Sequence, residues 1–333
     1  MLTNIVIWIL LAVAAFWFFG GFRFLARRKA DGSLKAAMAA ASQSPGLMRL
    51  RTALSSGDAN ALRVALPQSS WTDLLSFEPE SDAHLPALEA YLQANPDELK
   101  GLFLLGSAQV NAAWKARSGS TADNLTTDQA ADFFTLLNKA DQTLTHALSQ
   151  HPACEFLYPS MITVKKGLGQ KDQAYAIYQQ ASEHKALGFA AAQAMVSLLA
   201  ARWLGSKEEM FRFANEQKRQ HSTLPAMGAI ELSAHIEQNI DGEVKNYLKR
   251  KEVSETLAIA EKCARAVNGD DASSRHMRFA ILNNMAMVYS LRGEKKRAKL
   301  VFAELGANWH SYPWKYANND PRSIFMEFAK LSA

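Results

Sequence analysis

The chain has 333 residues, 48% of them hydrophobic, and its 37 basic and 32 acidic residues give a formal net charge of +5. This length and composition predict a globular protein with a substantial buried core and exclude an intrinsically disordered chain. The two cysteines and eight histidines are scattered without metal-ligand spacing, so neither a disulfide framework nor a metal site is indicated.

Most of the excess positive charge lies near the N-terminus. Residues 1–35 contain one acid, Asp31, and five basic residues, a net charge of +4 that leaves +1 for the rest of the chain. A nearly neutral remainder lacks the basic surface of a general nucleic-acid-binding protein, so no nucleic-acid partner is expected. The five basic residues are Arg23, Arg27, Arg28, Lys29 and Lys35.

The segment from Ile5 to Phe22 (IVIWILLAVAAFWFFGGF) carries no charge and no strongly polar side chain. As a helix it is about 27 Å long, close to the thickness of the hydrocarbon core of a bilayer. We therefore expect an N-terminal transmembrane helix over residues 5–22. A cleaved signal peptide is the alternative, but residues 1–4 have no basic side chain, and arginines follow the apolar segment in place of a small-residue cleavage site.

The basic residues predict the orientation of this helix. Arg23, Arg27, Arg28 and Lys29 follow the span directly, and the positive-inside rule holds such a flank in the cytoplasm. Residues 1–4 are then extracytoplasmic, residues 23–35 form a basic juxtamembrane segment, and residues 36–333 form a cytoplasmic domain at the bacterial inner membrane. The same basic residues are also able to bind anionic lipid headgroups.

Residues 36–333 are predicted to be all-α, because apolar residues recur every three to four positions and strand signals are missing. Asn95-Pro96-Asp97-Glu98 is typical of a helix start, and Ser206-Lys207-Glu208-Glu209 matches a capping box. The expected breaks are a long polar loop at Arg117–Asp128 and turns at Asn239–Glu243 and Asn268–Ser274.

Several helix pairs fit the spacing of a 34-residue helix–turn–helix repeat. The fullest match is Ala286, Tyr289, Gly293, Ala298 and Phe302, where small residues alternate with aromatic ones around a turn glycine. Gly169, Ala174, Tyr178 and Ala181 repeat the second half, and Gly57, Leu62 and Leu66 echo it more weakly. The pattern predicts a tetratricopeptide-like α-helical solenoid, in which small residues let helices approach closely.

Residues 102–235 resemble the uncharacterised bacterial family known as domain of unknown function 4034. The resemblance rests on Trp114-Lys115-Ala116-Arg117 before a polar loop, the helix at 140–152, the Gly167-Leu168-Gly169 turn, and Arg202-Trp203-Leu204-Gly205-Ser206 before Met210, Phe213 and Ala214. The family pattern has glycine where this chain has Leu204, and arginine where it has Asn215. The resemblance implies a tetratricopeptide-like helical fold and no activity.

No catalytic motif emerges, so no catalytic residue and no cofactor are predicted. A Walker A sequence, H-E-x-x-H and G-x-S-x-G are all missing. One S-x-x-K sequence, Ser182-Glu183-His184-Lys185, would place a serine and a lysine on one helix face, but its companion motifs are absent and chance explains it best.

Two Trp–Arg pairs are the candidate partner-binding residues, because tryptophan and arginine concentrate binding energy at protein interfaces. They are Trp114 with Arg117 and Arg202 with Trp203. Packing between helices is the alternative interpretation of both pairs. The aromatic segment Trp309–Tyr316 is expected to cap an open end of the helical stack.

The preferred hypothesis is a membrane-anchored helical-repeat scaffold that binds a protein partner near the cytoplasmic face, with no small-molecule substrate indicated. Repeat surfaces and the lack of catalytic motifs favour it. The alternatives are an envelope or lipid-related assembly factor that uses Arg23–Lys29, and an enzyme subunit whose site is dispersed along the sequence.

Overall fold

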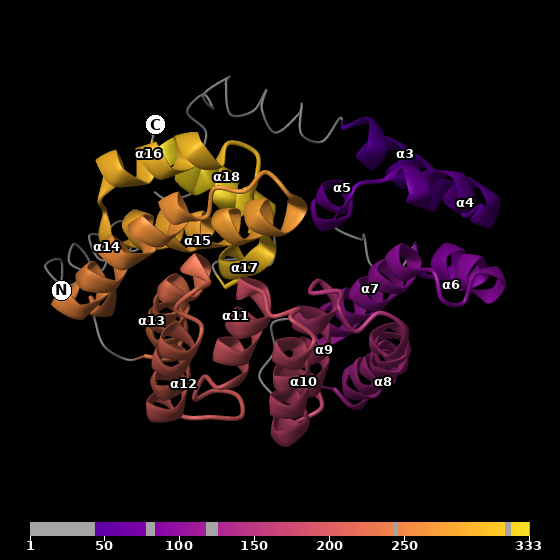
Figure 1. Cartoon of the computed structure of the whole chain (residues 1–333), viewed down its shortest axis with the longest axis horizontal. Coiled ribbons are helices and arrows are strands. Elements are labelled where there is room, and N and C mark those ends of the chain that lie inside the picture. Colours follow the sequence, from indigo (N-terminus) through magenta and orange to yellow (C-terminus); the bar gives the residue numbers. More distant parts are fainter. Residues whose placement is uncertain (1–43, 78–83, 118–125, 243–245, 317–320, 333) are drawn as a thin grey trace, which may run out of the picture.

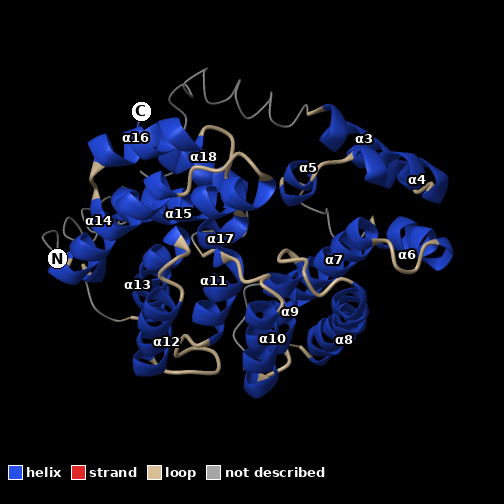
Figure 2. Cartoon of the chain, in the orientation of Figure 1, coloured by secondary structure: helices blue, strands red, loops and turns tan. Residues whose placement is uncertain are grey.

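The computed structural model describes residues 44–77, 84–117, 126–242, 246–316 and 321–332, and this part of the chain contains helices and no strand (Figure 2). The prediction of an all-α protein is confirmed for these residues. In chain order the helices are α3 (Pro45–Ser56), α4 (Ala59–Gln68), α5 (Trp71–Leu75), α6 (Leu85–Ala94), α7 (Leu99–Arg117), α8 (Thr127–Gln150), α9 (Leu157–Gly167), α10 (Lys171–Glu183), α11 (Phe189–Leu198), α12 (Lys207–Gln220), α13 (Ile230–Asp241), α14 (Lys251–Ala266), α15 (Ala272–Arg292), α16 (Lys295–Leu305), α17 (Ser311–Trp314) and α18 (Pro321–Ser332). Two short 3₁₀ helices are η2 (Pro225–Ala229) and η3 (Tyr247–Lys249).

Three glycines of the repeat pattern lie at the bends between paired helices. Gly57, Gly169 and Gly293 have φ angles of 68°, 72° and 76°. This left-handed backbone region favours a residue that lacks a Cβ atom. The glycines join α3 to α4, α9 to α10, and α15 to α16, so helix pairs are present at all three predicted places.

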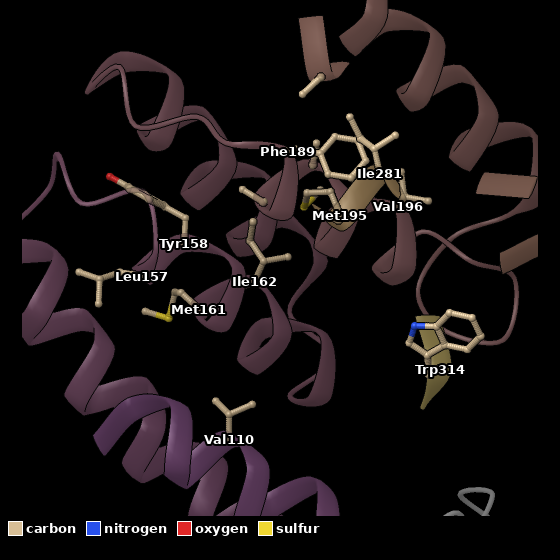
Figure 3. Packing of buried hydrophobic residues seen from close by; sticks show 14 of the residues in the cluster. Val110, Leu157, Tyr158, Met161, Ile162, Phe189, Met195, Val196, Ile281 and Trp314 are labelled. Carbon is tan, nitrogen blue, oxygen red and sulfur yellow. The ribbon is translucent and has the colours of Figure 1, made fainter. Parts of the chain in front are cut away.

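The helices follow one another around a curved array (Figure 1), and contacts join neighbours from α6 through α16. Helix α15 also contacts α5, so the first and last parts of the described array meet. A close-up of the core shows Phe189 and Val196 of α11 near Ile281 of α15 (Figure 3). The described helices therefore share one continuous core.

The beginning of α7 differs from the sequence prediction. Asn95 ends α6, where its Nδ2 donates to the Tyr91 carbonyl at 3.0 Å, and α7 begins only at Leu99. The Glu98 carboxylate caps α7 by accepting from the Gly101 N–H at 2.6 Å. Because a carboxylate oxygen satisfies a free helix N–H as well as an amide does, the prediction placed the cap three residues too early.

The predicted capping box at Ser206 forms only in half. The Ser206 Oγ accepts from the Glu209 N–H at 3.2 Å, as expected. The Glu209 carboxylate turns instead to α10, where it binds Lys171 Nζ at 2.6 Å and the Tyr175 hydroxyl at 3.3 Å. A tertiary ion pair has replaced the local hydrogen bond.

The predicted break at Asn239–Glu243 contains the end of α13, which stops at Asp241, and residue 243 lies outside the described residues. One further prediction is wrong in its local geometry. Helix α10 ends at Glu183, and Lys185 has a φ of 56°, so the serine and lysine of the S-x-x-K sequence do not share a helix face.

The aromatic segment Trp309–Tyr316 turns inward, so the prediction that it caps an open end is wrong. Its anchor is Asn283 of α15, which is fully buried. The Asn283 Oδ1 accepts from Trp314 Nε1 at 2.7 Å and from the His310 N–H at 3.2 Å, while its Nδ2 donates to the carbonyls of Phe279 at 2.8 Å and Asn308 at 3.0 Å. These buried bonds fix the segment against α15.

The predicted transmembrane helix Ile5–Phe22 and its basic flank lie outside the described residues. The flank consists of Arg23, Arg27, Arg28 and Lys29. Among the helices that are described, none is both long enough and apolar enough to cross a membrane.

Candidate functional site

The structure brings together the two Trp–Arg pairs that the sequence singled out. The rings of Trp114, in the last turn of α7, and Trp203, which follows α11, lie edge to face with centroids 5.3 Å apart. The Arg117 guanidinium lies 4.8 Å from the Trp203 ring centroid and 5.6 Å from that of Trp114. Such stacking favours a guanidinium over an ammonium. Two pairs that are far apart in the sequence thus form one cluster.

A tight turn after α11 positions Arg202 and Trp203. The Leu204 N–H donates to the Leu198 carbonyl at 3.0 Å, which folds the chain back before α12 begins. A side chain at Gly205 would collide with the Leu199 carbonyl, so only glycine fits there. Ser206 then caps α12, and the turn holds the tryptophan ring toward α7.

Sequence reasoning missed the central residue of the cluster, Lys166. Its side chain extends from α9 to the side of both indole rings, with Nζ 5.0 Å from the Trp114 centroid and 4.8 Å from that of Trp203. Its Nζ also donates to the Ser197 Oγ at 3.1 Å, and only 6% of the residue is exposed. The adjacent Lys165 is different, because its Nζ pairs with the Asp141 carboxylate at 2.7 Å.

Burial lowers the pKa of the Lys166 ammonium to about 7, and the positive charges of Lys315, Arg202 and Arg117 act in the same direction. The negative charge of Glu237 opposes this shift only in part. The physical cause is the cost of keeping a charge in a medium that solvates it poorly. Two lysines before Gly167 are ordinary at the end of a helix, so Lys166 has no distinguishing signal in the sequence.

Arg202 forms ion pairs with both carboxylates of the cluster and offsets one of their two negative charges. Its guanidinium donates to Glu237, which is fully buried, and to Asp241 at the end of α13. Burial alone would lower the Arg202 pKa, but the Glu237 and Asp241 carboxylates raise it above its usual value. Asp241 was predicted to lie in a turn, and it is held in the helix end by the Ala201 N–H at 2.9 Å as well.

The C-terminal segment closes the cluster from the side of α17. The Tyr316 hydroxyl lies 3.1 Å from both the Glu237 Oε1 and the Ser197 Oγ. Lys315 is exposed, and its Nζ lies 5.4 Å from the Tyr316 ring centroid. We call the whole group the Lys166 cluster, with the members Trp114, Arg117, Lys166, Ser197, Arg202, Trp203, Glu237, Asp241, Lys315 and Tyr316.

No family model matches the chain, and searches of the curated proteins and of the solved structures find no similar protein. The resemblance over residues 102–235 therefore stays a prediction. Its motifs nevertheless meet in space, because the Trp114–Arg117 helix end, the Gly167 turn and the Arg202–Trp203 turn all border the Lys166 cluster.

The cluster has more hydrogen-bond donors than acceptors. The indole Nε1 atoms of Trp114 and Trp203 are both buried and have no hydrogen-bond partner. Four basic side chains face two carboxylates, and Arg202 already pairs with both of these. Such a site favours an anion that accepts hydrogen bonds. Within the described part of the chain, no group of three or more His, Cys, Asp or Glu side chains is placed to hold a metal ion.

Proposed function

We propose that this chain is a binding protein, a membrane-anchored helical-repeat scaffold that holds an acidic segment of a protein partner at the Lys166 cluster. The observation that supports the proposal is a buried lysine in contact with two tryptophans whose indole N–H groups have no hydrogen-bond partner. Unpaired buried donors destabilise a fold by about 1–3 kcal/mol each. A ligand carboxylate that accepts from them would recover this cost.

The charges of the cluster favour an acidic occupant. Lys166, Arg117 and Lys315 make contacts with aromatic rings and form no ion pair with any residue that the structure describes. An aspartate or glutamate of a partner would compensate their charge and exclude water from the tryptophan faces. Lys315 and Arg202 are exposed and Arg117 is half-buried, so these three side chains would meet the partner before Lys166 does.

The proposed localisation of the chain is the cytoplasmic face of the bacterial inner membrane. It rests on the apolar span Ile5–Phe22 and on the basic flank that follows it. An anchored array of helices presents its binding surface near the membrane, where a partner is held at high local concentration.

Crosslinking in living cells tests the proposal on the full-length chain. A photoreactive residue replaces the exposed Ala201, which precedes Arg202 and carries no charge, and separately the exposed Val64 or Leu300, which are 59% and 71% exposed and lie outside the cluster. We expect a specific protein to be captured at position 201 and not at Val64 or Leu300.

A charge variant decides whether the capture depends on the proposed chemistry. With the photoreactive residue at position 201, Lys315→Gln should reduce capture by about tenfold, as the loss of one charge-assisted contact would. Lys251→Gln is the matched control, because the Lys251 side chain is 91% exposed and does not belong to the cluster. Equal capture in the two variants, or equal capture at Leu300, would contradict the proposal.

A further inference from the structure

A second site lies where the two ends of the helical array meet. A cavity of about 320 Å³ opens between α3 and α5 on one side and the first turns of α15 on the other. Figure 1 shows α5 beside α15, and the two helices are in contact. This volume lies within the range of small-molecule sites, and the cavity shares none of the residues of the Lys166 cluster.

The lining of this cavity is basic and contains no aspartate or glutamate among the described residues. Three arginines from three separate helices line it: Arg51 from α3, Arg275 from α15 and Arg322 from α18. Arg51 and Arg322 also interact with other residues of the chain, but a guanidinium has five N–H donors and can share them with a ligand. Arg275 lies over the Phe279 ring at 5.8 Å and makes no ion pair with any residue that the structure describes. Arginines that converge on one cavity are typical of a site for an oxyanion.

Two acidic side chains on the neighbouring helices are engaged in helix caps. Asp271 caps α15 by accepting from the Ser274 N–H at 2.9 Å and from its hydroxyl at 2.6 Å. The carboxylate of Asp73 on α5 accepts from the Ser70 hydroxyl at 2.7 Å and from that of Ser44 at 2.5 Å. Neither residue lines the cavity, so an anion that enters it meets no carboxylate from these two positions.

Two stacked histidines form part of the wall. The rings of His276 and His310 lie 4.5 Å apart and 23° from parallel. Burial lowers the pKa of His276 to about 4, and burial together with His276 lowers that of His310. Both rings are therefore neutral near pH 7, and each offers one N–H donor without repelling the other. Trp309 and Tyr312 add aromatic surface.

We propose that this cavity binds the phosphate group of a small phosphorylated compound. A tetrahedral phosphate presents oxygens in several directions, so it accepts from guanidinium groups that come from three helices, whereas a planar carboxylate faces one or two. The same phosphate chemistry could come from a soluble metabolite or from a phospholipid headgroup. The aromatic wall favours a compound in which the phosphate is attached to a ring or chain of modest size.

Calorimetric titration of the full-length protein in a neutral detergent tests this proposal. The probes are sodium phosphate, adenosine monophosphate and dihexanoyl phosphatidic acid, and each has a control compound: sodium chloride, adenosine and dihexanoyl phosphatidylcholine. We expect at least one phosphate probe to bind with a Kd below about 1 mM, and its control compound not to bind. Binding of the monophosphate alone assigns a soluble ligand, and binding of the phosphatidic acid alone assigns a headgroup.

Two substitutions in α15 test whether the phosphate probe binds in this cavity. Arg275→Gln should weaken the binding of the phosphate probe by about tenfold or more, because it removes a guanidinium of the cavity. Arg278→Gln is the control: Arg278 lies further along α15, pairs with Glu304 at 2.6 Å and does not line the cavity. The proposal is overturned if no phosphate probe binds, or if both variants weaken binding equally. Circular dichroism of each variant establishes that it is folded.

Discussion

The chain buries polar side chains around Asn283 and around Lys166, and the two regions differ in how completely their hydrogen-bonding groups are paired. Around Asn283 every polar atom of the amide finds a partner, two donors facing its oxygen and two carbonyls facing its nitrogen. Around Lys166 the ammonium has one hydroxyl partner, and two neighbouring indole N–H groups have none. Because buried polar groups are nearly always paired, the first region is a complete structural network, and the unpaired donors of the second are the basis of the proposal that it binds a ligand.

The difference is also one of position. Asn283 lies in the middle of α15, whose residues from Ala280 to Tyr289 are all buried, so water and ligands have no access. Lys166 is bordered by Arg117 and Trp203, which are both partly accessible. Unsatisfied donors next to an accessible rim are able to meet a ligand, which a closed core cannot offer.

The largest effect is expected from breaking the complete network. Asn283→Ala should lower the free energy of unfolding by about 4 kcal/mol, because it leaves two donors and a loop carbonyl unpaired and opens a cavity. Urea unfolding followed by circular dichroism measures the loss. Asn215→Ala is the control: the Asn215 side chain makes a similar bond to the Phe211 carbonyl but is exposed, and a change below about 0.5 kcal/mol is expected. Similar losses of unfolding free energy in both variants would show that the buried Asn283 hydrogen bonds stabilise the fold no more than an exposed one does.

The next largest expected effect is a pH dependence of stability that Lys166 causes. Its folded pKa of about 7 lies below the ordinary value of 10.5, so between these values the unfolded chain binds more protons and stability rises with pH. From pH 7.5 to 9 the wild type should gain about 2 kcal/mol more than Lys166→Met. Urea unfolding at the two pH values measures this difference.

The neighbouring lysine provides the control for this pH dependence. Lys165 pairs with Asp141, so Lys165→Met should keep the gain in stability that the wild type shows. An unchanged gain in Lys166→Met would mean that Lys166 is solvated and would remove the basis for the binding site.

The smallest expected effect is the difference in stability between removing a paired indole N–H and removing an unpaired one. Trp314→Phe removes the N–H that donates to Asn283, whereas Trp203→Phe removes one that has no partner. Trp314→Phe should therefore be the more destabilising variant, by about 1 kcal/mol, because the Asn283 Oδ1 keeps the His310 N–H as a donor. Thermal unfolding of both variants measures the difference. A larger loss in Trp203→Phe would show that the Trp203 N–H is already satisfied in the folded chain.

The sequence by itself determined the helical class, the bends at Gly57, Gly169 and Gly293, and the two Trp–Arg pairs as candidates. These features are local: a helix period repeats every few residues, and a left-handed bend requires glycine at one position. The prediction of a membrane span at residues 5–22 has the same local basis.

Only the tertiary structure decided which of the predicted residues belong together. Lys166 carries no sequence signal, because a lysine near the end of a helix is common. Its burial against Trp114 and Trp203 depends on how α7, α9 and the turn after α11 pack. The cavity lined by Arg51, Arg275 and Arg322 likewise exists only because distant helices meet. In a sequence, an isolated arginine is interpreted as a solvated surface charge. Only the packing of the helices determines whether several arginines face one cavity.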